Sequence, residues 1–130
     1  MITIDQMIDT IKKGYNNTIP EDMIKSFVLK MVKNNNVVFK QEGFAFYLKV
    51  DDKTIERIAK EPGYILNQDN LLKILQSTGD NVHFFGVLST INEDASKAIF
   101  KGLNEVIEKE KPRTVSWWNP AMKKFITRRI

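Results

Sequence analysis

The sequence predicts an α+β domain: a mixed, mostly antiparallel sheet with two N-terminal helices and one strand-helix-strand crossover. Apolar residues recur at helical spacing in two segments near the N-terminus, and then alternate with a period of two through residues 37–50. Further along, a strand that is apolar on both faces precedes a long amphipathic helix and another strand. That order is typical of a crossover between parallel strands of one sheet.

The two N-terminal helices are predicted from their apolar stripes. The second helix covers residues 23–32, and Thr18 and Glu21 stand at capping-box spacing around Pro20 before it. After three asparagines, residues 37–50 form the clearest hairpin pattern in the chain. The stripe of the first helix consists of Ile4, Met7, Ile8, Ile11 and Tyr15.

Two short helices are predicted in the middle of the chain. Asp51 or Asp52 can cap the first, which ends before Pro62, and Asn67 or Asp69 can begin the second. The first carries Ile55, Ile58 and Ala59, and the second is centred on Leu71, Leu72, Ile74 and Leu75.

The crossover is predicted from residue 82 onward. Residues 82–88 are apolar on both faces, as expected of a central strand covered on two sides. The helix that follows opens at the capping-box pair Thr90 and Glu93 and continues to Lys111. Two strands complete the chain, at residues 114–118 and, as an edge strand, at residues 123–130.

The composition predicts a single domain over residues 1–130 and excludes several chemistries. With 42% apolar and 28% charged residues, the chain has ordinary globular composition. Without cysteine it has no disulfide and no thiolate site, and with His83 as its single histidine it has no multi-histidine zinc site. The acidic pairs at residues 51–52 and 93–94 precede helices, where the helix dipole explains them, so we expect no metal.

The sequence also bears on location. No apolar run reaches the ~18 residues of a membrane span. The first residues begin a helical pattern rather than a basic and then apolar secretion signal. We therefore expect a cytoplasmic protein with no membrane partner.

The positive charge is concentrated at the C-terminus. Residues 111–130 contain six basic and no acidic residues, whereas residues 1–110 contain fourteen basic and sixteen acidic ones. Adjacent Trp117 and Trp118 point to opposite faces of a strand, so one can enter the core while the other faces a groove or solvent. An exposed indole beside Lys123 and Lys124 could contact a nucleic acid or another partner. Alternatively, the cations guard an edge strand against aggregation.

The order of the elements resembles that of the GNAT acyltransferase superfamily. The stretch Val115-Ser116-Trp117-Trp118-Asn119-Pro120, followed by Lys123-Lys124-Phe125, is also similar to small, divergent phage-encoded GNAT-like proteins. In that family a central strand diverges from its neighbour beside the crossover helix, and the pantetheine of an acyl-CoA enters between them. The resemblance implies a GNAT-like fold, acyl-CoA or acetyl-CoA as cofactor, and acyl transfer to an amine of an unknown acceptor, a small molecule or a protein. It places cofactor contacts at Val87, Leu88 and Ser89.

His83 is the candidate catalytic residue, because histidine is the side chain that titrates near neutral pH without a large pKa shift. The alternative is a structural histidine on a buried strand. The segment of residues 89–94 lacks the glycine and cation that a typical family member uses to bind the cofactor pyrophosphate. The competing function is therefore a non-enzymatic phage or mobile-element accessory domain. It would bind protein or nucleic acid through the basic C-terminal edge.

Overall fold

The computed structural model describes residues 3–14, 17–40, 43–61, 63–76, 79–88, 93–119 and 124–130. Its elements in chain order are α1 (Ile4–Gly14), α2 (Glu21–Lys33), β1 (Val37–Lys40), β2 (Gly43–Val50), α3 (Asp52–Lys60), the 3₁₀ turn η1 (Tyr64–Leu66), α4 (Gln68–Gln76), β3 (Asn81–Leu88), α5 (Glu93–Glu110), β4 (Thr114–Asn119) and β5 (Lys124–Arg129). The predicted α+β class is confirmed, and the turn η1 is an addition that the sequence pattern did not indicate.

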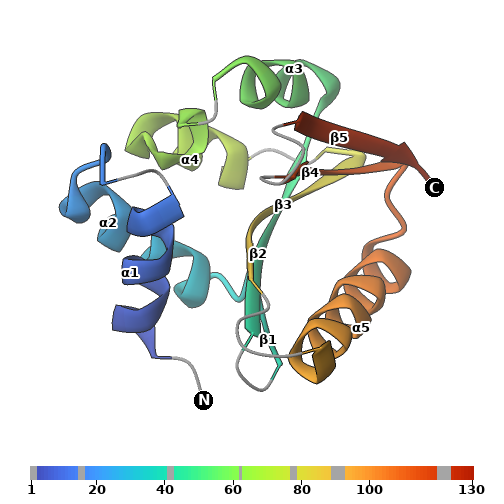
Figure 1. Ribbon diagram of the computed structural model, residues 1–130. Helices are drawn as coiled ribbons and strands as arrows, with labels where there is room; N and C mark the ends of the chain where they lie inside the picture. The colour runs from blue at the N-terminus through green and yellow to red at the C-terminus, as the bar shows by residue number, and fades with distance from the viewer. Residues whose placement is uncertain are drawn as a thin grey trace.

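The strands form one mixed sheet in the order β1-β2-β3-β4-β5. Neighbouring strands are antiparallel except β3 and β4, which are parallel and are connected through α5. Figure 1 shows α1, α2 and α4 on one side of the sheet and α5 on the other. The predicted crossover is therefore present, and β5 is the predicted edge strand because it ends the strand order.

Polar side chains cap the two short helices. At the start of α3, Oδ1 of Asp51 accepts a hydrogen bond from the backbone N–H of Thr54 at 2.8 Å. Before α4, Oδ1 of Asn67 accepts from the backbone N–H groups of Asp69 and Asn70. Both caps use a side-chain oxygen to satisfy first-turn amides, so Asp51 and Asn67 are the capping residues among the predicted candidates.

The two predicted capping boxes have different outcomes. Helix α2 begins at Glu21 with Pro20 in the N-cap position, two residues beyond Thr18, so the helix starts later than the spacing of Thr18 and Glu21 predicted. Thr90, the capping residue predicted for α5, lies outside the described residues.

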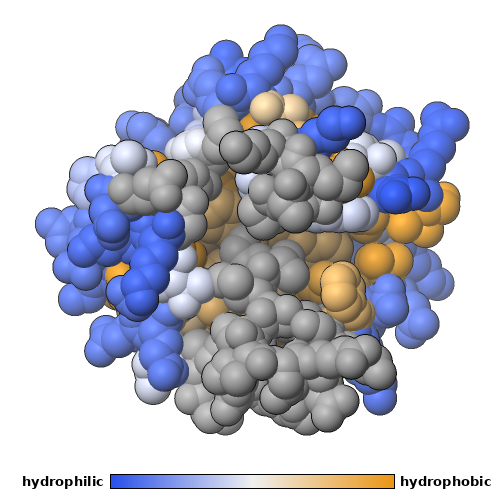
Figure 2. Space-filling model, viewed as in Figure 1, coloured by the Kyte–Doolittle hydropathy of each residue, from blue (hydrophilic) through white to orange (hydrophobic). Residues whose placement is uncertain are grey.

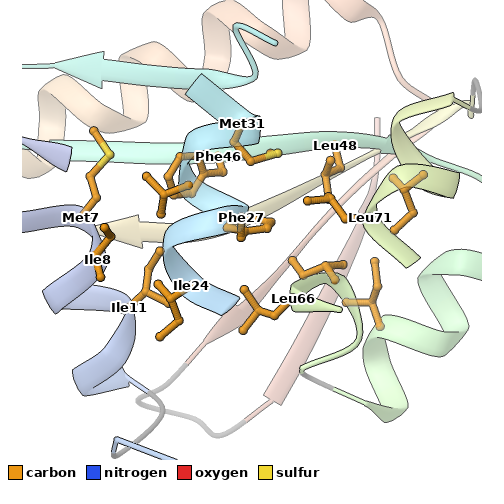
Figure 3. Close-up of a cluster of buried hydrophobic side chains, with 14 of the residues drawn as sticks. Met7, Ile8, Ile11, Ile24, Phe27, Met31, Phe46, Leu48, Leu66 and Leu71 are labelled. Carbon is orange, nitrogen blue, oxygen red and sulfur yellow. The ribbon is translucent and has the colours of Figure 1, made fainter. Parts of the chain in front are cut away.

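The larger core lies between the sheet and the helices α1 to α4. The alternating residues of β2 that the sequence placed on one face, Phe44, Phe46, Leu48 and Val50, are all buried in it. Phe27 of α2 packs edge-on against Phe46, with ring centroids 5.4 Å apart. Figure 3 shows the neighbours of these rings: Met7, Ile8 and Ile11 of α1, Ile24 and Met31 of α2, Leu66 of η1 and Leu71 of α4.

A second core lies on the opposite face of the sheet, against α5. Strands β2 and β3 therefore bury apolar side chains on both faces, as predicted for a central strand. The buried residues of this second core are Ala45, Tyr47, Val82, Phe84, Leu103, Val106 and Val115.

The beginning of β3 is joined to two neighbouring strands through Asn81, whose side chain is buried. Its Nδ2 donates to the carbonyl oxygen of Val50 at 3.1 Å and to Oδ1 of Asp52 at 2.9 Å. Its Oδ1 accepts from the hydroxyl of Thr114 at 2.6 Å. The end of β2 and the starts of α3, β3 and β4 therefore meet at one amide.

The chain also passes very close to the end of β2 just before β3. A Cβ added at Gly79 would lie 2.0 Å from the carbonyl carbon of Val50, a contact that no folded backbone tolerates. At Gly63 the nearest atom to such a Cβ would be Cδ1 of Ile19, at an ordinary 3.7 Å. Glycine is therefore required at residue 79, and alanine is acceptable at residue 63.

We predict that Gly79→Ala destabilises the protein by about 3 kcal/mol or more, because backbone must move to admit the methyl group. Gly63→Ala is the matched control, and we expect it to change stability by less than about 1 kcal/mol. Urea unfolding followed by circular dichroism measures both. Equal stability of the two variants would contradict the close approach of Gly79 to β2.

Candidate functional site

The candidate site is the gap that opens between β3 and β4. Parallel pairing joins Asn81 to Thr114, Val82 to Val115 and His83 to Ser116. Both strands then continue, β3 to residue 88 and β4 to residue 119, and within the described residues no further pair joins them. The two strands therefore separate beyond His83 and Ser116.

A β-bulge on β3 accompanies this separation. Phe44 of β2 pairs with Leu88, and Phe46 pairs with Phe85, so two steps along β2 span three steps along β3. An extra residue bends the bulged strand and increases its local twist. In Figure 1, β3 accordingly follows β2 downward, while β4 and β5 remain together at the top.

Two of the three predicted cofactor contacts, Val87 and Leu88, lie at this gap. Val87 and Leu88 belong to the part of β3 beyond its last pair with β4, and Leu88 pairs on the other side with Phe44. The backbone of these two residues is described, and their side chains are not; Ser89 lies outside the described residues. On its β4 side this stretch has no strand partner within the described residues.

His83 lies at the closed end of the gap. Its side chain is only 2% exposed, and Nδ1 is 2.9 Å from Oγ of Ser116 in a hydrogen bond whose donor depends on the tautomer. Burial lowers the pKa of the imidazole from 6.5 to about 4. The ring is therefore neutral at pH 7, and its partner is a hydroxyl rather than the orienting carboxylate expected beside a catalytic histidine. These properties favour the structural alternative.

Aromatic side chains line one face next to His83. The ring of Phe125 stacks on the imidazole, with centroids 5.5 Å apart and an interplanar angle of 17°. Trp118, which pairs with Phe125 across β4 and β5, is 48% exposed. Trp117 points to the opposite face and packs against the second core. One tryptophan is therefore turned inward and the other outward, as the alternation predicted.

The two lysines predicted as contacts, Lys123 and Lys124, directly precede Phe125 in the sequence. Lys124 begins β5 and is exposed, and Lys123 lies outside the described residues. Two of the predicted site residues, His83 and Trp118, lie close together because both are neighbours of Phe125: His83 stacks on its ring, and Trp118 pairs with it across β4 and β5. Lys124 lies one residue from Phe125, on the same strand.

A charged cavity of about 270 Å³, which no sequence pattern indicated, lies near the other end of β3. Lys49 forms an ion pair with Glu110 at 3.2 Å beside it, and Arg113 pairs with Asp52. The Arg113 guanidinium and the Asn81 amide hold the pKa of the Asp52 carboxyl below its ordinary value. No motif marks the cavity because its wall comes from separate segments: Lys49, Gly79, Asp80, Val82, Glu110, Lys111, Pro112 and Arg113.

The described residues contain no group of three or more histidine or acidic side chains arranged to hold a metal ion. No described helix is both long enough and apolar enough to cross a membrane.

Comparisons with known proteins complete the description of the site. A scan against protein-family models, a search of curated proteins and a search of solved structures found no match.

Burial of His83 predicts a pH dependence of stability. Because the folded pKa is about 4 and the unfolded pKa is 6.5, the unfolded chain binds a proton first as the pH falls. The free energy of unfolding is therefore highest above pH 6.5 and decreases between pH 6.5 and about 4, by about 3 kcal/mol in all. Urea unfolding at several pH values measures the decrease.

His83→Gln is the control for this pH dependence, because it removes the titrating ring and keeps a polar side chain. We expect its unfolding free energy to be nearly flat between pH 6.5 and about 4.5, above the range where ordinary carboxylates titrate. A wild-type protein that is equally stable at both ends of this window would show that His83 is not buried as a neutral ring.

Proposed function

We propose that the protein is a divergent GNAT-like acyltransferase that binds an acyl-CoA in the gap between β3 and β4. It transfers the acyl group to an amine of a small molecule or protein. The observation that carries the proposal is the short parallel pairing: three residue pairs join strands that both continue past it. A fully paired sheet would leave no room for a pantetheine arm between the strands.

The bulge on β3 supports the same proposal. It lies at the residues where β3 has left β4, so the curvature that opens the gap is built into the pairing with β2. Pantetheine contains two amide groups, and an unpaired strand edge offers N–H and C=O groups at the spacing of a β-ladder. The cofactor would thus add to the edge of β3 near Val87, Leu88 and Ser89, as an extra strand does.

The transfer itself requires an amine nitrogen to attack the thioester carbonyl carbon. The carbon–sulfur bond breaks, coenzyme A leaves as its thiol, and the attacking nitrogen loses a proton. Proton removal falls to His83 or to a water that it orders. Burial lowers the pKa of this ring to about 4, which makes it a weak base.

The nucleotide end of the cofactor faces a different environment. Helix α5 begins with Glu93 and Asp94, whose charges oppose a pyrophosphate at the helix start. We therefore propose that binding depends mainly on the acyl-pantetheine end. A coenzyme A donor also implies a cytoplasmic location.

Thermal unfolding with added ligand tests cofactor binding. Acetyl-CoA at ten times its dissociation constant should stabilise the folded protein by about 1.4 kcal/mol and raise Tm by about 4 °C. Acetyl-pantetheine, which lacks the nucleotide, should retain most of this effect, and ATP at the same concentration should have none. No shift with millimolar acetyl-CoA, or an equal shift with ATP, would remove the cofactor from the proposal.

Hydrogen exchange tests where the cofactor binds. Acetyl-CoA should slow exchange in peptides that cover residues 84–88, because pantetheine would bond backbone groups on the side of β3 where the described residues supply no strand partner. Peptides from α2, on the far side of the larger core, are the internal control. Protection elsewhere, with unchanged exchange across residues 84–88, would place the ligand outside the gap.

A further inference from the structure

The hairpin of β4 and β5 carries an exposed surface that the acyl-CoA proposal does not use. Strand β5 pairs with β4 on one side and ends the strand order on the other. The hairpin surface consists of Trp118, Lys124, Phe125, Arg128 and Arg129.

Strand register divides this surface into two faces. Trp118 pairs with Phe125 and Thr114 pairs with Arg129, which places Phe125 and Arg129 on the face of Trp118. Lys124 and Arg128 alternate with them and point to the other face of β5. Because β5 ends the strand order of the described residues, cations on both of its faces flank the edge that faces away from β4.

The aromatic part of the surface packs on the buried ring of His83. Phe125 is stacked on His83, which is buried and bonded to Ser116. Trp118 lies next to Phe125 across the hairpin and leaves 48% of its surface exposed. A large aromatic ring on a rigid support presents a flat face for stacking at little entropic cost.

The cationic part of the surface is not neutralised by the described part of the chain. Lys124, Arg128 and Arg129 are exposed and take part in none of the ion pairs seen there. Arg113, which directly precedes β4, is paired with Asp52. Residues 111–130 contain no acidic residue. Figure 2 shows strongly hydrophilic residues beside hydrophobic ones at the upper right, where β5 ends in Figure 1.

We propose that this hairpin surface binds single-stranded nucleic acid. One base stacks on Trp118, and the phosphates on either side of it pair with Lys124, Arg128 and Arg129. An aromatic ring beside unpaired cations matches the two features that a single strand offers, exposed base faces and a regular line of negative charge. A duplex hides its base faces inside the helix, and an acidic peptide lacks them. The proposal is independent of acyl-CoA binding.

Fluorescence anisotropy with a labelled oligothymidine tests the proposal, using the full chain without acyl-CoA. Three phosphate contacts give a slope near −2 for log affinity against log salt, so binding weakens about 20-fold between about 50 and 200 mM salt. Stacking on Trp118 should also quench tryptophan fluorescence on binding. Absence of binding at low salt, or binding that salt does not weaken, overturns the proposal.

Substitutions separate stacking from charge. Trp118→Ala should weaken binding about tenfold, whereas Phe39→Ala, which truncates a 43% exposed aromatic on the opposite edge strand β1, should not. The triple change K124Q/R128Q/R129Q should abolish the salt dependence. Its matched control is K25Q/K33Q/K73Q, which removes the same charge from exposed lysines of α2 and α4. Circular dichroism confirms that each variant is folded.

Competition experiments identify the class of ligand. Unlabelled single-stranded DNA and RNA should displace the probe, and a duplex of equal length or polyglutamate should do so only at much higher concentration. Equal competition by the duplex or by polyglutamate would show a surface that recognises charge without bases, and would overturn the assignment. Equal loss of affinity in both triple variants would show that no particular surface is used, with the same consequence.

Discussion

A buried amide at the start of β3 holds together the segments on which the rest of the fold depends. Asn81 is 1% exposed, so its donors and acceptor need protein partners, and they find them at Val50, Asp52 and Thr114. The backbone N–H of Arg113 adds a bond to the carbonyl oxygen of Asp80 at 2.6 Å. Strands β2, β3 and β4 are therefore joined at one end. Parallel strands that are held at one end can separate at the other without loss of register.

The separation of β3 and β4 follows from what covers each part of the sheet. Beyond His83, β3 stays paired with β2, and Phe84 and Phe85 pack into opposite cores. Strand β4 instead stays with β5, to which it is paired along its whole length. Each strand thus stays paired with its antiparallel neighbour, and only the parallel pairing between β3 and β4 ends early. His83 and Ser116 close the gap at its inner end because each supplies the hydrogen bond that the other needs once buried.

The same arrangement separates two chemical environments. Within the described residues, β3 has no partner on its β4 side beyond His83, and α5, which follows it in the chain, begins with an acidic sequence. Strand β5, by contrast, is rich in basic residues. A ligand with a neutral amide chain suits the first environment, and a polyanion with flat rings suits the second. The global charge of +4 therefore says little about this protein, since the excess belongs to one hairpin.

Much of the fold is determined by local sequence, and the candidate site is not. Periodicity alone predicts both N-terminal helices, the alternating face of β2 and the doubly covered β3, because these depend on which side chains share a face. It also predicts that Trp117 and Trp118 point apart. Only the tertiary structure decides where β3 leaves β4, that His83 meets Ser116, and that Lys49 meets Glu110 beside a charged cavity. Those contacts join residues far apart in the chain, and strand register and the bulge, which are set by packing on both faces of the sheet, determine them.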